Sequence, residues 1–112
     1  MNQAPPTSRV YRDGKVAVLI SRGFGAGWST WNKSYPGMLY DAQVVDLLLN
    51  ETNFDDVYIK AQEICAIKYP DAYISVEGLE VVWIDQGRKF VVQEYDGSEH
   101  IQFLDEVEWE TA

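Results

Sequence analysis

The chain has 112 residues, of which 46% are hydrophobic and 13% aromatic, and its formal net charge is −9. This length fits a single domain over residues 1–112, and the apolar content excludes an intrinsically disordered chain. The negative charge argues against phosphate-driven binding to a DNA or RNA polymer, which needs a basic face. Three interpretations stay open: a local cationic pocket, an acidic surface that binds a basic protein partner, or charge that only keeps the protein dissolved.

The composition offers little for redox or metal chemistry. The single cysteine, Cys65, cannot form an internal disulfide, and its apolar neighbours predict a buried core residue. Apart from Cys65, the only side chain that could bind zinc through nitrogen or sulfur is a single histidine, His100. One cysteine and one histidine are too few ligands for a zinc site, so we expect no zinc site and no cofactor. No apolar run approaches the roughly 18 residues of a membrane span. Residues 1–8 form a loose, Pro-rich arm rather than a signal peptide, so we expect a cytoplasmic protein without membrane contact.

A β-hairpin is expected at the start of the chain. Residues 9–12 and 16–20 flank Asp13-Gly14, a dipeptide that favours two-residue hairpin turns. The second strand, Lys15 to Ile20, is almost entirely apolar. That pattern is typical of a central strand covered on both faces.

Two helices are expected in the middle. Asp41 can cap a short, largely buried helix that ends near Asn50. Asn53 can cap a second helix over about 54–68, in which apolar residues recur near a period of about 3.6. Tyr69-Pro70 then ends this helix, because the residue before a proline disfavours helical backbone.

The rest of the chain is rich in β-branched and aromatic residues, which favour strands. We expect strands at 72–76, 79–84, 89–95 and 100–104, with turns at 85–88 and at Asp96-Gly97. This order predicts an α+β fold: a mainly antiparallel sheet, made of an N-terminal hairpin and a C-terminal meander, with two helices packed on it. How the hairpin pairs with the meander cannot be read from the sequence.

The most distinctive stretch is the glycine-rich segment, residues 21–32 (SRGFGAGWSTWN). Alternate glycines let backbone N–H groups approach a ligand closely, an arginine can bind phosphate with a bidentate fork, and aromatic rings can stack on a base. A second cationic pair follows the turn at 85–88. On this chemistry the predicted ligand-binding residues are Arg22, Phe24, Gly25, Trp28, Ser29, Trp31, Arg88 and Lys89.

The pattern is only moderately specific. It is not a phosphate-binding P-loop, because no Gly-Lys-Ser/Thr follows the glycines, and its G-x-G-x-G spacing differs from the dinucleotide fingerprint. A bulge or tight crossing that uses the tryptophans as core explains the same residues. A protein interface is the third interpretation, because Trp and Arg are enriched at interface hot spots.

Three stretches, Val16–Asn32, Leu79–Ile84 and Glu94–Glu99, resemble a family of short phage and prophage proteins, the first type of Thoeris anti-defence proteins. The resemblance implies a sponge that sequesters a small nucleotide signal, a cyclic ADP-ribose isomer or a cyclic oligonucleotide, and does not cleave it. No nucleophile–base pair or metal-ligand spacing is visible in the sequence, so we expect no enzyme.

The alternative function is an acidic protein-binding inhibitor of a host defence enzyme. Salt dependence would separate the two, since binding between charged surfaces weakens as salt rises. We also expect a homo-oligomer, because Val107 and Trp109 stand in an acidic tail with nothing local to bury them.

Overall fold

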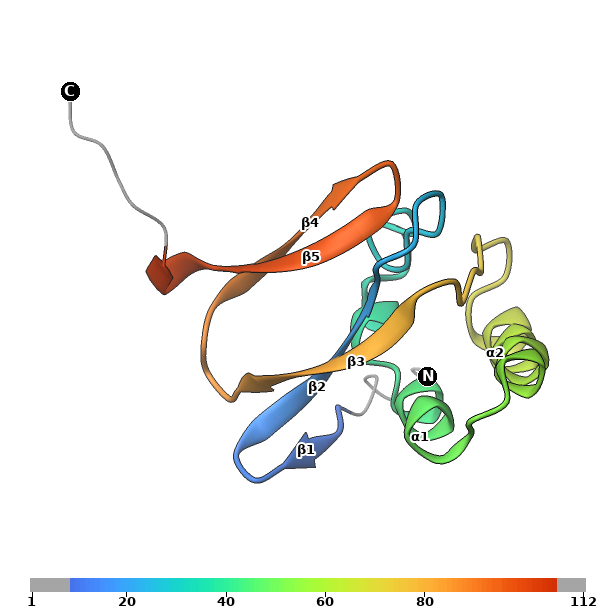
Figure 1. The fold of residues 1–112 in the computed structure, drawn as a ribbon, viewed down its shortest axis with the longest axis horizontal. Helices are drawn as coiled ribbons and strands as arrows, with labels where there is room; N and C mark the ends of the chain where they lie inside the picture. The colour runs from blue at the N-terminus through green and yellow to red at the C-terminus, as the bar shows by residue number, and fades with distance from the viewer. Residues whose placement is uncertain (1–8, 107–112) are drawn as a thin grey trace, which may run out of the picture.

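The computed structural model describes residues 9–106 and has the expected α+β fold, with antiparallel sheets and two α-helices (Figure 1). The predicted arm at 1–8 and the tail residues Val107 and Trp109 lie outside the described part of the chain. No helix of the described residues is long and apolar enough to cross a membrane.

A three-stranded antiparallel sheet forms the middle layer. β1 (Tyr11–Arg12) and β2 (Lys15–Ser21) make the predicted hairpin, and β2 also pairs along its whole length with β3 (Leu79–Asp85), from Lys15 opposite Asp85 to Ser21 opposite Leu79. The turn residues Asp13 and Gly14 both have positive φ, 53° and 76°, as a type I′ hairpin turn requires.

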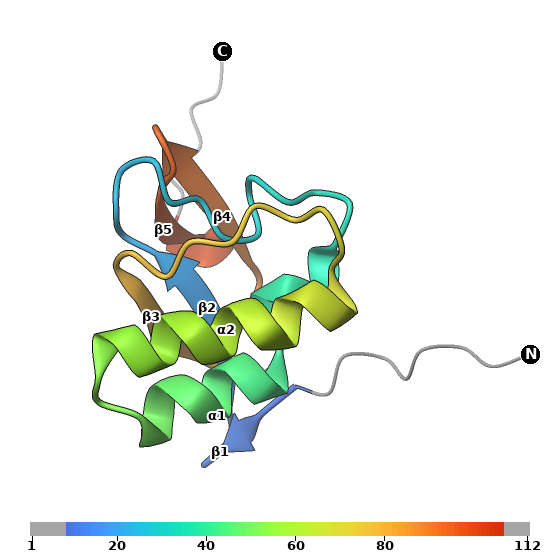
Figure 2. The ribbon, with the colours of Figure 1, turned by 90° about the vertical axis from the view of Figure 1, so that its right-hand side faces the viewer.

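The helices cover one face of this sheet. α1 (Ala42–Asn50) and α2 (Phe54–Lys68) have the predicted side-chain caps: Asp41 accepts a hydrogen bond from the Val44 N–H, and Asn53 accepts one from the Asp56 N–H. A short 3₁₀-helix, η1 (Pro36–Tyr40), precedes α1. Figure 2 shows the two α-helices side by side against the sheet. Their apolar faces meet Ala17 and Leu19 of β2 in the main core.

A second hairpin covers the other face. β4 (Phe90–Tyr95) pairs with β5 (Ser98–Phe103), and their apolar side chains pack on Val18 and Ile20 of β2. The described part of the chain ends in a short 3₁₀ turn, η2 (Leu104–Glu106). β2 is therefore covered on both faces, as its apolar sequence predicted.

The C-terminal strands do not form one continuous meander. β3 joins β2, whereas β4 and β5 make a separate two-stranded sheet. The tight turn that follows β3 carries the chain across to the opposite face of β2, where Phe90, Val92, Ile101 and Phe103 become half-buried. Apolar side chains on both faces of β2 need two covering layers, so splitting the meander buries more of them.

The strand predicted at 72–76 is wrong, because these residues form neither a strand nor a helix. The Asn32 side chain takes the place of a neighbouring strand: its Nδ2 donates to the Tyr73 carbonyl at 2.8 Å, and its Oδ1 accepts from the Tyr73 N–H at 2.7 Å. One side-chain amide thus satisfies the backbone of Tyr73 and ties this stretch to the glycine-rich segment.

Candidate functional site

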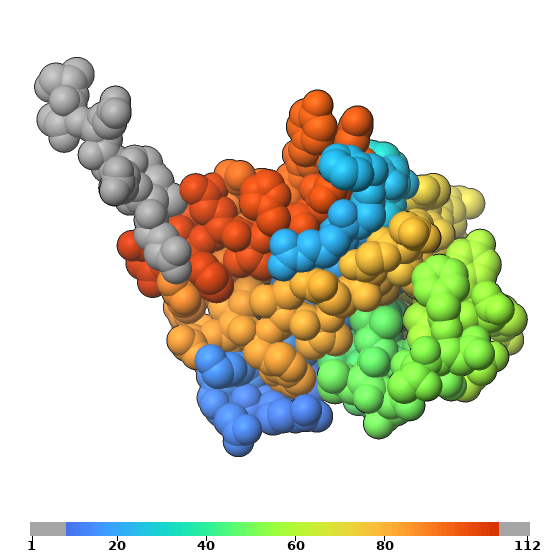
Figure 3. Space-filling model, viewed as in Figure 1, coloured from blue at the N-terminus to red at the C-terminus, as the bar shows by residue number. Residues whose placement is uncertain are grey.

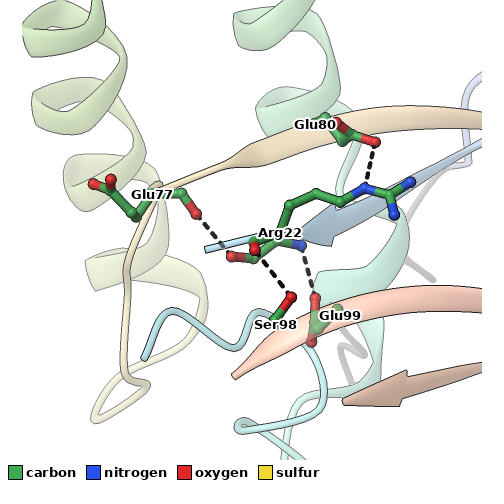
Figure 4. Close-up of polar contacts among 6 residues, drawn as sticks. Arg22, Glu77, Glu80, Ser98 and Glu99 are labelled. Atoms are coloured by element: carbon green, nitrogen blue, oxygen red, sulfur yellow. Dashed lines mark hydrogen bonds and ion pairs between the residues drawn. The ribbon is translucent and has the colours of Figure 1, made fainter. Parts of the chain in front are cut away.

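A buried carboxylate organises the glycine-rich segment. Glu99 of β5 is fully buried, and its oxygens accept hydrogen bonds from the N–H groups of Ser21 (2.9 Å), Trp28 (3.0 Å) and Thr30 (3.0 Å) and from the Thr30 hydroxyl. In Figure 4 this carboxylate turns from β5 toward the end of β2. Backbone amides of the glycine-rich segment, which the sequence suggests as donors to a ligand phosphate, therefore bind the Glu99 side chain of the protein itself.

The glycines allow backbones to touch at this junction. The N–H of Gly25 donates to the Asp96 carbonyl, and the N–H of Gly27 donates to the Gly97 carbonyl at 2.8 Å. A Cβ at Gly97 would lie 2.8 Å from the Ala26 nitrogen, and one at Gly23 would lie 2.8 Å from the Glu77 carbonyl oxygen. The segment is thus packed against the β4–β5 turn and the 77–78 turn, with its outer side at the surface beside the hairpin tip (Figure 3).

The predicted aromatic residues divide between core and surface. Trp28 is fully buried, and its Nε1 donates to the Met38 carbonyl at 2.7 Å. Trp28 therefore offers no face to a ligand, which corrects that assignment: its ring fills the core between β2 and the helices. Phe24 and Trp31 are 72% and 43% exposed, and a Cβ added at Gly25 would meet open space.

Arg22 lies apart from the other predicted cations. Its Nε forms an ion pair with Glu80 of β3 at 3.0 Å, and its carbonyl accepts from the Ser98 hydroxyl at 2.9 Å (Figure 4). The Ser98 contact places it beside β5, and the Glu80 contact places it at the start of β3. Arg88 and Lys89 lie at the start of β4 instead, so the structure does not bring all the predicted cations together.

Arg88 and Lys89 line a groove between η1 and β4. One hollow, of about 500 Å³, lies next to another of about 290 Å³, and both are lined by Leu39 and Val92. We call the two together the η1–β4 groove. Its polar and charged lining residues are Arg9, Ser29, Thr30, Lys33, Arg88 and Lys89.

The groove gathers four of the nine cationic side chains of an acidic protein. Arg9 stacks over the Tyr40 ring at 3.9 Å, and Arg88 stacks over Phe103 at 3.5 Å while pairing with Asp105. Lys33 and Lys89 are exposed and form no ion pair with any residue from 9 to 106. Two lysines without a carboxylate partner among the described residues, with Leu39 and Val92 between them, suit an anionic ligand that also carries an apolar ring.

Sequence reasoning found Ser29, Arg88 and Lys89 in this groove and missed Arg9 and Lys33. Lys33 directly follows the glycine-rich segment, so its position was a usable signal. Arg9 had none, because only the pairing of β1 with β2 and the docking of the second hairpin bring it near Arg88.

The other reactive side chains lie elsewhere. Burial, reinforced by the negative charge of Asp41, raises the pKa of the Cys65 thiol to about 12, so this core residue holds its proton at neutral pH. His100 is exposed on the outer face of β5, with Nε2 3.2 Å from Gln93 Oε1. Within residues 9–106, no three His, Cys, Asp or Glu side chains come together as metal ligands.

Comparison with protein-family models, with curated proteins and with solved structures finds no match to this chain.

Proposed function

We propose that this protein binds and sequesters a small nucleotide signal, a cyclic ADP-ribose isomer or a cyclic oligonucleotide, and releases it unchanged. The sequence resemblance to phage anti-defence sponges suggests the class of ligand. The η1–β4 groove is the observation that carries the proposal. Such a sponge would act in the cytoplasm of the host cell.

The groove supports nucleotide binding through charge and shape. Lys33 and Lys89 have no anionic partner among residues 9–106, and phosphate groups would supply that negative charge. A charge-assisted hydrogen bond is about twice as strong as a neutral one. Apolar side chains between the cations, Leu39 and Val92, can contact a ribose or a base. The net charge of −9 repels anions at long range, so the attraction must act locally and inside the groove.

Sequestration without turnover follows from the kind of binding proposed. Lysine contacts and stacking stabilise the ground state of a ligand, and equal stabilisation of ground and transition states gives no acceleration of the chemical step. Cleavage of a phosphodiester or glycosidic bond normally needs general acid–base groups or a metal ion. We therefore expect the bound nucleotide to be recovered intact.

Thermal unfolding with a ligand panel tests the proposal. Cyclic ADP-ribose isomers, cyclic di-AMP and cyclic GMP–AMP are each added to the protein, and a specific ligand raises the melting temperature by mass action. The protein is then denatured and the released nucleotide is examined by mass spectrometry. Detection of a cleaved product would show that the protein is an enzyme and not a sponge. The absence of any shift across the panel would leave the groove without a nucleotide function.

A protein-binding inhibitor is the second candidate, favoured by one observation. Phe24 and Tyr95 are 72% and 73% exposed at the junction of the glycine-rich segment and the hairpin tip, and their rings meet edge to face. Exposed aromatic pairs in an acidic protein suit a basic partner protein. Replacing Phe24 by Ser would abolish such an interaction and leave nucleotide binding in the groove unchanged.

Self-association is a further part of the proposal. α2 exposes Phe54, Tyr58 and Ile59, with 45–55% of each side chain accessible, and exposed apolar patches mark contact surfaces. Light scattering at micromolar concentration would return the mass of a homo-oligomer. A monomer mass would remove this expectation and leave the groove untouched.

A further inference from the structure

Trp31 is held as a rigid platform near the η1–β4 groove. One face of its indole rests on Gly27, where a Cβ would overlap the ring, and Tyr73 lies tilted against it with ring centroids 5.7 Å apart. Nε1 donates to Glu94 Oε2 at 3.3 Å. The side chain nevertheless keeps 43% of its surface exposed, so a fixed ring presents an open area on which a flat group can stack.

Glu94 places a fixed acceptor at the edge of that ring. Its Oε2 accepts from the Gly97 N–H at 2.9 Å as well as from Trp31. Its Oε1 accepts no hydrogen bond from a described residue, although a carboxylate oxygen has two lone-pair sites. A preorganised oxygen therefore stands beside a preorganised ring, and neither has to be ordered when a ligand binds.

The platform lies at one end of the groove. Side chains alternate along a strand, so Phe90, Val92 and Glu94 share one face of β4, and the step from Phe90 to Glu94 spans about 13 Å. Val92 lies in the groove, and Lys33 lines both the groove and the hollow beside Trp31. Glu94 therefore continues the row of β4 side chains whose members Phe90 and Val92 line the groove, and it lies at the end of that row away from Arg88 and Lys89. A nucleotide has the complementary polarity, with anionic phosphates at one end and N–H donors on the base at the other.

We propose that Trp31 and Glu94 form a base subsite, in which a purine stacks on the indole and its exocyclic amino group donates to Glu94 Oε1. The phosphates then extend toward Lys33 and Lys89. This subsite rests on the proposed nucleotide function and adds to it a rule of selection. Bases that carry an amino group toward Glu94 are accepted, and bases that present only acceptors there are repelled by the carboxylate lone pairs.

Calorimetric titration with ADP and with 1,N6-ethenoADP tests the rule. The two probes share their phosphates and a flat ring, but the etheno bridge removes both amino hydrogens. The wild-type protein should bind ADP roughly tenfold more tightly, as expected for one charge-assisted hydrogen bond. In Glu94→Gln the side-chain oxygen still serves Trp31 and Gly97, and an NH₂ group replaces the free oxygen. This variant should lose the preference for ADP.

Two further variants make the outcomes decisive. Trp31→Ala should weaken the binding of both probes alike, because both stack on the indole. Glu63→Gln makes the same chemical change as Glu94→Gln, but on α2, which does not line the groove. This control variant should keep the preference for ADP. Equal affinity of the wild type for both probes would overturn the base subsite and leave the proposed function standing. A preference that persists in Glu94→Gln would show that the bulk of the etheno bridge causes it, and would also overturn the subsite. If neither probe binds, the subsite fails together with nucleotide binding in the groove.

Discussion

The glycine-rich segment and the η1–β4 groove use polar groups in opposite ways. In the segment, amides, glycines and a buried carboxylate satisfy one another: Glu99 is fully buried and accepts from three backbone N–H groups. In the groove, Lys33 and Lys89 face solvent without a carboxylate partner among the described residues. The segment is conspicuous in the sequence, yet the exposed cations that we propose to bind the ligand lie in the groove.

The glycine-rich segment shows that a motif suited to binding a ligand can instead stabilise the fold. Close-set amides at a glycine-rich stretch suit any anion, and here an anion is supplied by the chain, from a strand 78 residues further on. The outer residues of the segment, Ser29 and Trp31, still reach the groove or the hollow beside it. We infer that the segment is a structural support, and we propose that only its outer residues contribute to binding.

The largest effect should come from removing the buried carboxylate. Glu99→Ala leaves the buried N–H groups of Ser21 and Trp28 and the partly buried N–H of Thr30 without an acceptor, and each buried donor costs about 1–3 kcal/mol. We expect the free energy of unfolding to fall by roughly 3–5 kcal/mol, measured by urea denaturation. Glu63→Ala, an exposed change on α2, is the control and should shift it by less than about 0.5 kcal/mol. Similar stabilities of the two variants would show that the segment does not depend on Glu99.

The next effect concerns the contact between the segment and the hairpin tip. Gly97 has φ of 84°, and a Cβ there would lie 2.8 Å from the backbone nitrogen of Ala26. Gly14 has a similar φ of 76° but open space around it. Gly14→Ala should therefore cost only the conformational penalty of about 1–2 kcal/mol, whereas Gly97→Ala adds a steric cost of about 1–3 kcal/mol. Equal losses in thermal or urea unfolding would mean that the two backbones are not pressed together.

A smaller effect, on binding alone, is expected in the groove. Lys89→Ala removes an exposed cation without a described partner, so the free energy of unfolding should hardly change. The dissociation constant for ADP should rise about five- to tenfold, a change of about 1–1.4 kcal/mol in binding free energy. The salt dependence of binding should also become weaker. Lys60→Ala, which removes the same charge from α2, should leave the affinity within about twofold because Lys60 does not line the groove. Equal losses of ADP affinity in both variants would show that Lys89 acts only through the overall charge of the protein and not through a contact in the groove.

Local signals predicted the helices and turns well, and contacts between distant residues explain what they missed. The caps Asp41 and Asn53 and the Asp13-Gly14 turn act within four residues, so the sequence displays them. The role of Glu99 depends on partners about 70–80 residues away, and no neighbour in the sequence signals it. The groove likewise combines Arg9, Lys33 and Lys89 from three separate segments, of which only the last was predicted.

The smallest effect should come from Arg22, which the sequence placed in the same site as Lys89. Its guanidinium is already paired with Glu80 at 3.0 Å, and both side chains are about half exposed, so the pair contributes less than about 1 kcal/mol. It also lies on the β5 side of the second hairpin, with its carbonyl bound by Ser98, whereas the groove follows β4. We expect Arg22→Ala to change the dissociation constant for ADP by less than about twofold, which is under about 0.4 kcal/mol. Calorimetry on Arg22→Ala beside Lys89→Ala measures this contrast directly, since both variants remove one positive charge. A larger loss in Arg22→Ala would move the ligand from the η1–β4 groove to the face formed by β3, β5 and the glycine-rich segment, and would restore the site that the sequence first suggested.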